Sequence, residues 1–144
     1  MSLELDQLPS QPWTQDVRIW RNGDTAEPAG ASVPRSVIWH SPDGFNFGYH
    51  GSGAADLALN ILNAFVPPRA TSRLEEDIDW TERDDDPVQC YQGVCSRFAA
   101  RWHQAFKREF IASMQSPGGT IKAAIIQSWI AQRIDSRANE SCET

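Results

Sequence analysis

The sequence predicts an α+β protein in which a small antiparallel three-stranded sheet is covered by about three helices. Short N-terminal segments alternate apolar and polar residues, tight-turn residues separate them, and longer segments after residue 53 carry apolar residues at helical spacing. The chain has 144 residues, 40% of them hydrophobic and 22% charged, which is the composition of one globular domain.

The three predicted strands form a meander. They are Val17–Trp20, Ser36–His40 and Phe45–Tyr49, each alternating apolar with polar or small residues. Asn22-Gly23-Asp24 predicts a turn after the first strand, and Ser41-Pro42-Asp43-Gly44 predicts a tight turn between the second and the third.

A glycine-rich corner should connect the third strand to the first helix. With Gly53 as N-cap, or Ser52 as the alternative, Asp56 falls in the first turn, where a carboxylate favours the positive end of the helix. Pro67-Pro68 should end the helix. The expected buried stripe is Leu57, Ala58, Ile61, Leu62, Ala64 and Phe65, with Asn60 and Asn63 beside it.

The same corner is a candidate ligand site, because backbone N–H groups at a helix N-terminus attract anions. It lacks the Lys-Ser or Lys-Thr of a phosphate-binding loop and the spacing of a dinucleotide fingerprint, so a structural turn is the favoured alternative. The candidate ligand-binding residues are Gly48, Tyr49, His50, Gly51, Ser52 and Gly53.

An acidic insertion occupies residues 69–87. Such a run is normally a solvated loop, but its aromatic residue suits a surface that meets a basic groove. Metal binding is a further possibility, although the spacing of an EF-hand is missing. The candidate partner-binding residues are Glu75, Glu76, Asp77, Asp79, Trp80, Glu82, Asp84, Asp85 and Asp86.

Two more helices are predicted after the insertion. The first spans Val88–Met114, with Gly93 weakening its beginning, and the second follows Thr120 as its cap. The expected buried stripe of the last helix is Ile121, Ala124, Ile125, Trp129 and Ile130. The cations Arg97, Arg101, Lys107 and Arg108 should either pair with the acidic insertion or form an anion site.

The run FNFGYHGSGAADLALNIL resembles the signature of a family of small uncharacterised proteins, the domain-of-unknown-function family 6166. Matching positions are Phe45, Phe47, Gly48, Tyr49, Gly51, Ser52, Gly53, Ala55, Leu57, Ala58, Ile61 and Leu62, while Ala54 replaces the usual proline. The run WHQAFKREFIA (102–112) and the segment up to Trp129 resemble the family's second half.

This resemblance covers roughly residues 17–134 and implies no particular activity. The family occurs in bacteria, plasmids and phages, which implies an accessory role that interferes with a host system.

Charge and composition exclude several classes of function. The net charge of −6 argues against sequence-independent nucleic-acid binding, and no apolar run is long enough to span a membrane. Three cysteines without a zinc-site spacing are expected as reduced thiols of a cytoplasmic protein. We expect a flexible arm (1–15), one α+β domain (16–135) and a disordered tail (136–144), with no cofactor and no catalytic residues.

Two functional hypotheses follow. The first is a non-enzymatic binding protein of a mobile genetic element that inhibits a host protein or protein–nucleic-acid complex through the acidic surface, in its sharpest form an anti-defence inhibitor of the anti-CRISPR kind. The second is a protein that binds a nucleotide or phosphate at the glycine corner. Self-association through exposed tryptophans is a third hypothesis.

Overall fold

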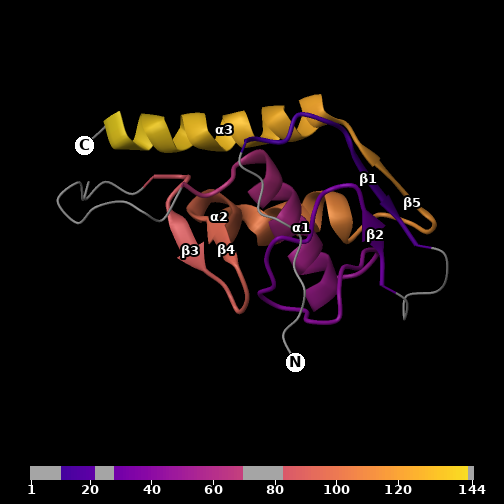
Figure 1. Cartoon of the computed structure of the whole chain (residues 1–144). Helices are drawn as coiled ribbons and strands as arrows, with labels where there is room; N and C mark the ends of the chain where they lie inside the picture. The colour runs from indigo at the N-terminus through magenta and orange to yellow at the C-terminus, as the bar shows by residue number, and fades with distance from the viewer. Residues whose placement is uncertain (1–10, 22–27, 70–82, 143–144) are drawn as a thin grey trace.

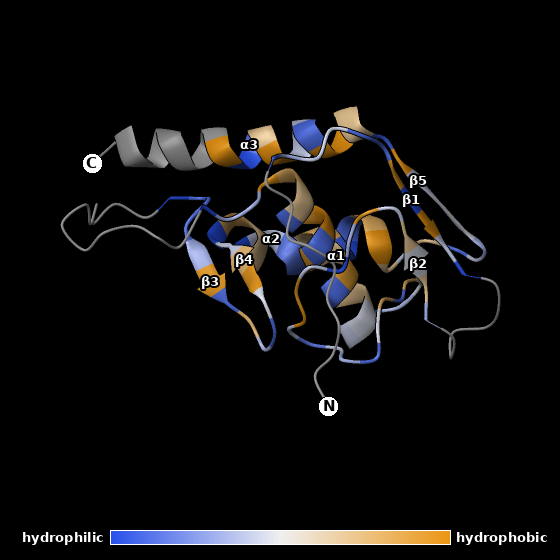
Figure 2. Ribbon diagram, in the orientation of Figure 1, coloured by the Kyte–Doolittle hydropathy of each residue, from blue (hydrophilic) through white to orange (hydrophobic). Residues whose placement is uncertain are grey.

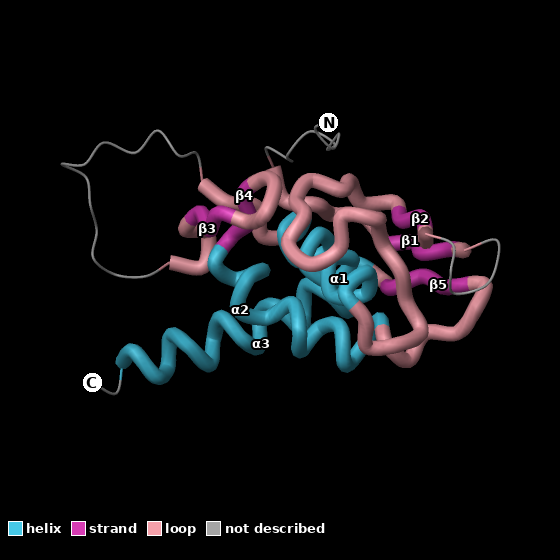
Figure 3. The backbone as a smooth tube through the Cα atoms, turned by 90° about the horizontal axis from the view of Figure 1, so that it is seen from below, coloured by secondary structure: helices cyan, strands magenta, loops and turns pink. Residues whose placement is uncertain are grey.

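The structure is a computed structural model that describes residues 11–21, 28–69 and 83–142, with side chains described up to residue 134. Its centre is helix α1 (Ser52–Phe65), in which every residue from Gly53 to Phe65 is buried. Helix α2 (Arg97–Phe106) and the π-helical turn Lys107–Ile111 pack on α1, and α3 (Ala123–Cys142) lies across them (Figures 1 and 3).

The α+β class and the three-stranded antiparallel sheet are confirmed. The strand order is β2–β1–β5, with β1 (Val17–Trp20) in the middle, β2 (Gly30–Ala31) on one side and β5 (Gly118–Ile121) on the other. Val17 pairs with Ile121 and Ile19 with both Ala31 and Gly119. Of the predicted strands only β1 is in this sheet, because β2 is just two residues long and β5 comes from the C-terminal half of the chain.

The predicted strand Ser36–His40 is wrong, and α1 supplies the reason. Buried polar side chains of α1 bind this segment's backbone: the Asn60 side chain accepts from the Val37 N–H (3.1 Å) and donates to the Val37 carbonyl (3.0 Å), and the Asp56 carboxylate accepts from the His40 N–H (2.9 Å). Only Ile38 makes a ladder contact, an isolated bridge to Gln92.

The predicted strand Phe45–Tyr49 is also wrong. Phe45 forms one isolated bridge with Ala29, while the Gly48 N–H donates to the Ile111 carbonyl of the π-helical turn (3.0 Å). The buried Arg21 side chain donates to the Phe47 carbonyl (3.0 Å). The alternation of Phe45 and Phe47 therefore reflects burial of both rings by an irregular segment, which period-two patterning does not distinguish from a strand.

The predicted helix Val88–Met114 begins nine residues late. Its first part is the hairpin of β3 (Pro87–Gln89) and β4 (Val94–Ser96), with Gly93 in the left-handed region at φ +84. The Ser96 side chain then accepts from the Ala99 N–H (3.1 Å) and caps α2. The helix therefore begins after this cap, although apolar residues at helical spacing precede it.

The ends of the other helices differ as well. The N-cap of α1 is Gly51, so Asp56 lies beyond the first turn and is buried. Thr120 lies in β5; the carboxylate that caps α3 is Asp16, which accepts from the Ala123 N–H (2.8 Å). That hydrogen bond is the main cause that holds the pKa of Asp16 below its ordinary value.

The buried face of α3 is rotated relative to the predicted stripe. Ile126, Trp129 and Ile130 are buried, whereas Ile125 is half-exposed, and Figure 2 shows that apolar and polar residues are mixed along the described part of α3. The helix continues to Cys142, past the domain boundary at residue 135 expected from the sequence.

Candidate functional sites

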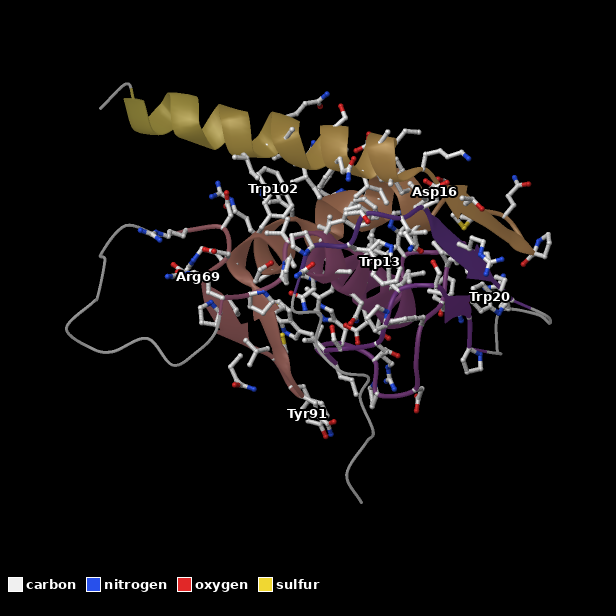
Figure 4. The ribbon with its side chains drawn as sticks, turned by 45° about the horizontal axis from the view of Figure 1, so that its top comes forward. Trp13, Asp16, Trp20, Arg69, Tyr91 and Trp102 are labelled. Carbon is white, nitrogen blue, oxygen red and sulfur yellow. The ribbon has the colours of Figure 1, made fainter. Side chains whose placement is uncertain are left out.

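Two large exposed aromatic side chains lie on neighbouring segments of the backbone, Tyr91 on the β3–β4 hairpin and Trp39 in the loop that precedes α1. Tyr91, at the tip, is 69% exposed, and Trp39 is 37% exposed. They are neighbours because the backbones of Ile38 and Gln92 exchange two hydrogen bonds (2.8 and 2.9 Å). Figure 4 shows Tyr91 pointing away from the body of the molecule, far from Trp20 on the three-stranded sheet. We call Trp39, Tyr91 and the outer strand β3 the hairpin face.

Hydrogen bonds and ion pairs hold both ends of the acidic insertion, Arg69 at its start and Asp84–Asp86 near its end. The Arg69 N–H donates to the Asp85 carbonyl (2.8 Å), and the Arg69 guanidinium pairs with the carboxylates of Asp85 (3.1 Å) and Asp86. The Arg97 N–H donates to the Asp86 carbonyl (2.7 Å) at the start of α2. Residues 69 and 84–86 thus form a stem beside the hairpin face.

The stem changes the interpretation of the predicted partner-binding residues. Asp85 and Asp86 pair with cations of the same chain, and the Asp84 carbonyl accepts from the Phe98 N–H (2.8 Å). The sequence left two alternatives for the cations of this helix, pairing with the acidic insertion or an anion site. Arg97 pairs with Asp86 of the insertion. Glu75, Glu76, Asp77, Asp79, Trp80 and Glu82 lie outside the described residues.

Asp86 shows the electrostatics of the stem. Its partial burial alone would raise the pKa of its carboxyl group, but the Arg83 N–H hydrogen bond and the charges of Arg69 and Arg97 outweigh burial and leave the pKa below its ordinary value. The folded stem therefore stabilises the ionised form of the Asp86 carboxyl group.

The glycine corner has a structural role. Gly48 has φ +87, a backbone conformation that favours glycine, and a Cβ on Gly51 would displace the exposed Tyr49 ring, which lies 2.1 Å from its position. A polar pocket of about 220 Å³ opens beside this corner. Of the six predicted residues it includes Tyr49, Ser52 and Gly53, whereas Gly48, His50 and Gly51 do not line it. The remaining lining residues are Pro28, Ser41, Asp43, Gly44, Phe45 and Asn46.

A pair of histidines lies next to the hairpin face. His40 and His103 come within 3.0 Å of each other through their Nε2 atoms, and Trp39 stacks on both imidazole rings with centroids 5.2 Å apart. His103 is buried, and burial is the main cause that lowers the pKa of its imidazole below the ordinary value. Among the described residues no cluster of three His, Cys, Asp or Glu side chains is placed to hold a metal ion.

Cys90 and Cys95 form a second close pair inside the hairpin. Both are buried free thiols, with their sulfur atoms 3.3 Å apart. The Cys95 S–H can donate to the Cys90 thiolate, which lowers the pKa of Cys90 and raises that of Cys95.

Sequence reasoning missed both pairs and the hairpin face. His40 and His103 are 63 positions apart, so no local spacing connects them. Cys90 and Cys95 are close in sequence, but inside a predicted helix they would not have faced each other across a hairpin turn. The exposure of Trp39 and Tyr91 carries no sequence signal, because both residue types are common in cores.

These features define a small α+β protein with one central buried helix and with a two-stranded hairpin and a three-stranded sheet around it. Residues 14–85 match the model of a family of unknown function, DUF6166, and the chain belongs to that family. Searches of curated proteins and of solved structures find no significant match. In the part of the chain that the structure describes, no helix combines the length and apolarity needed to cross a bilayer.

Proposed function

We propose that this protein is a non-enzymatic binding protein, and that its partner is a protein with a basic surface that docks on the hairpin face. The observation that carries the proposal is the exposure of Tyr91 at the hairpin tip and of Trp39 on the segment that the Ile38–Gln92 hydrogen bonds hold against the hairpin. Tyrosine and tryptophan are enriched at interface hot spots because they bury a large area while losing little rotamer freedom.

The charge of the chain indicates the chemistry of the partner. The net charge is −6, and the most acidic segment of the sequence begins and ends at the stem beside the hairpin face. Complementary charge increases the rate of encounter and disfavours acidic competitors. Because Asp85 and Asp86 already pair with Arg69 and Arg97, the attraction should come mainly from Glu75, Glu76, Asp77, Asp79 and Glu82.

More specifically, we propose that the protein is the product of a mobile genetic element. The partner would then be a host machine with a basic nucleic-acid channel, and the hairpin face with the acidic insertion would block that channel as an anti-defence inhibitor does. The resemblance of the glycine-corner motif to proteins of plasmids and phages supports this form.

The test is affinity capture from a host lysate with matched variants. Tyr91→Ala should reduce the captured partner at least about tenfold, as expected for loss of a hot spot worth 1.4 kcal/mol or more. Trp20→Ala is the control, because Trp20 is 43% exposed but lies away from the hairpin. A partner retained equally by both variants would contradict the proposed surface.

A second variant separates charge from shape. The triple substitution Glu75→Gln, Glu76→Gln and Asp77→Asn should weaken capture at low salt and lose that effect as salt rises, since exposed charges are screened within about 10 Å at 0.1 M. Binding that is unchanged by neutralisation at low salt would remove the acidic insertion from the interface.

A second candidate function is small-ligand binding at the glycine corner, which the pocket lined by Tyr49, Ser52 and Gly53 favours. Its size of about 220 Å³ suits a phosphate or sugar group rather than a whole nucleotide. In a thermal-shift panel of nucleotides and sugar phosphates, a true ligand at 100 times its Kd should add about 2.7 kcal/mol to the stability. The shift should disappear in Ser52→Val, and a panel without any shift would contradict this function.

A further inference from the structure

We propose that His40 and His103 together form a binding site for a divalent first-row transition-metal ion, with Cu²⁺ and Ni²⁺ preferred over Zn²⁺. This inference is independent of the partner-binding function and needs no macromolecular partner. It rests on the separation of the two imidazole nitrogens, on the tautomer that the backbone imposes, and on the rigid support of both rings.

The tautomer of His103 follows from its neighbours. Its Nδ1 atom lies 2.9 Å from the Ala100 carbonyl and 3.1 Å from the Ala99 carbonyl, and both of these groups only accept hydrogen bonds. The proton of neutral His103 is therefore on Nδ1, and its Nε2 lone pair accepts the Nε2–H of His40 across the 3.0 Å contact. A metal ion at the pair would replace that one proton, with neutral His40 then protonated on Nδ1. A metal-binding histidine is held in the same way, with its other ring nitrogen donating to a carbonyl or carboxylate.

The distance between the two Nε2 atoms suits a chelate. At a metal–nitrogen distance of about 2.05 Å, the observed 3.0 Å separation corresponds to an angle of about 94° at the metal. A tetrahedral zinc ion would need a separation of about 3.3 Å. An angle near 90° is that of square-planar or octahedral coordination, which Cu²⁺ and Ni²⁺ prefer.

Both rings are held in place before any ion binds. Trp39 stacks on His40 with the ring planes 7° apart and on His103 with the planes 30° apart. The N–H groups of Trp39, His40 and Ser41 donate to the buried Asp56 carboxylate, which fixes the backbone under His40. Little conformational freedom is left to lose, and the carboxylate charge favours a cation at the pair.

The ion would retain open positions. His40 is only half-buried, so solvent reaches this side of the pair. The Gln104 amide lies 3.4 Å from His103 Nε2, and a rotation of that amide would direct its oxygen to the ion. Within the described residues no third His, Cys, Asp or Glu completes a ligand set, so water should occupy the remaining sites.

The test is a calorimetric titration of the untagged full-length chain with Ni²⁺, repeated with Cu²⁺ and Zn²⁺. We expect one equivalent to bind, with affinity falling in the order Cu²⁺, Ni²⁺, Zn²⁺. His40→Ala and His103→Gln should each weaken Ni²⁺ binding at least about tenfold, because each removes one of the two ligands. His50→Ala is the matched control and should bind as the wild type does.

Circular dichroism establishes that each variant is folded. A second measurement, electron paramagnetic resonance, uses the wild-type chain alone. The electron paramagnetic resonance spectrum of the wild-type chain with half an equivalent of Cu²⁺ should show hyperfine coupling to two imidazole nitrogens. A spectrum with fewer than two, wild-type protein that binds no Ni²⁺, or Ni²⁺ binding that is undiminished in folded His40→Ala would overturn the proposal.

Discussion

At the scale of single residues, Asp56 shows how a buried charge is tolerated at the centre of the fold. Its carboxylate is fully buried and accepts from the backbone N–H groups of Trp39, His40 and Ser41 at 2.9–3.4 Å. Buried charges persist where hydrogen bonds replace the lost water. Asp56, which the sequence predicts in the first turn of a helix, therefore organises the loop of residues 39–41.

Replacing Asp56 with Ala should cost about 3 kcal/mol or more of unfolding free energy, because several buried N–H groups would lose their acceptor. Urea denaturation monitored by circular dichroism measures the loss. Asp43→Ala is the control: this carboxylate is exposed, and its removal should change the stability by less than about 0.5 kcal/mol. Equal stability of the two variants would contradict the assignment.

His103 predicts a pH dependence of stability. Burial first, and then the charge of His40, lower the pKa of His103, while hydrogen bonds to Ala100 and Ala99 and the charge of Asp56 oppose that shift. The unfolded chain therefore binds a proton at higher pH than the folded chain does. Stability should be complete above about pH 6.5 and fall on acidification, by at most about 1.4 kcal/mol per pH unit for this one proton.

The measurement is the midpoint of urea unfolding between pH 5 and pH 8. The slope should be shallower in His103→Gln and unchanged in His50→Gln, which lacks the exposed histidine of the glycine corner. Parallel curves for the wild type and His103→Gln would show that another group causes the dependence.

At the scale of elements, the stem of the acidic insertion predicts a modest contribution to stability. Arg69→Ala removes the ion pairs with Asp85 and Asp86, which are partly exposed, so the loss should be about 1 kcal/mol or less and should shrink in high salt. Because the pKa of Asp86 is lowered in the folded state, its contribution is present at neutral pH and is lost as the pH falls through that value.

Urea denaturation in low and high salt checks this prediction, with Arg108→Ala as the control on the exposed side of the π-helical turn. A loss well above 2 kcal/mol, or one that does not depend on salt, would mean that Arg69 acts by packing rather than by charge.

Elements were predictable from the sequence where their stabilising contacts are local. Val17–Trp20 and α1 follow from period-two and period-3.6 patterning, and the structure has both. Ser36–His40 and Phe45–Tyr49 have the same local patterns, but Asn60, Asp56 and Arg21 compete for their backbone groups from distant positions. The sequence contains these three side chains but does not indicate which backbone groups they bind.

At the scale of the whole molecule, the candidate sites depend on long-range packing. Tyr49, Ser52 and Gly53 of the predicted glycine corner do line a pocket, because one short segment contains them all. The histidine pair requires α2 to bring His103 against a loop that precedes α1, and the hairpin face requires residues 38 and 92 to meet. Neither arrangement can be inferred before the helices are packed.

The same long-range packing ties α3 to the rest of the domain, although α3 lies beyond residues 14–85 that match the family model. Trp129 is buried and packs edge-on against Phe106 and Trp102, and the Arg133 guanidinium lies 3.4 Å from the centre of its ring. Its indole N–H donates to Glu109 of the π-helical segment. These contacts predict that α3 unfolds together with α1 and α2.

Trp129→Ala should therefore cost about 3–5 kcal/mol, the usual loss for a buried aromatic residue replaced by alanine. Ile125→Ala, on the same helix but 51% exposed, should change the stability by less than about 0.5 kcal/mol. Calorimetry and circular dichroism should both report one transition that moves as a whole in Trp129→Ala. If an early separate transition appeared instead, α3 would be an appendage to a domain formed by α1, α2, the hairpin and the three-stranded sheet.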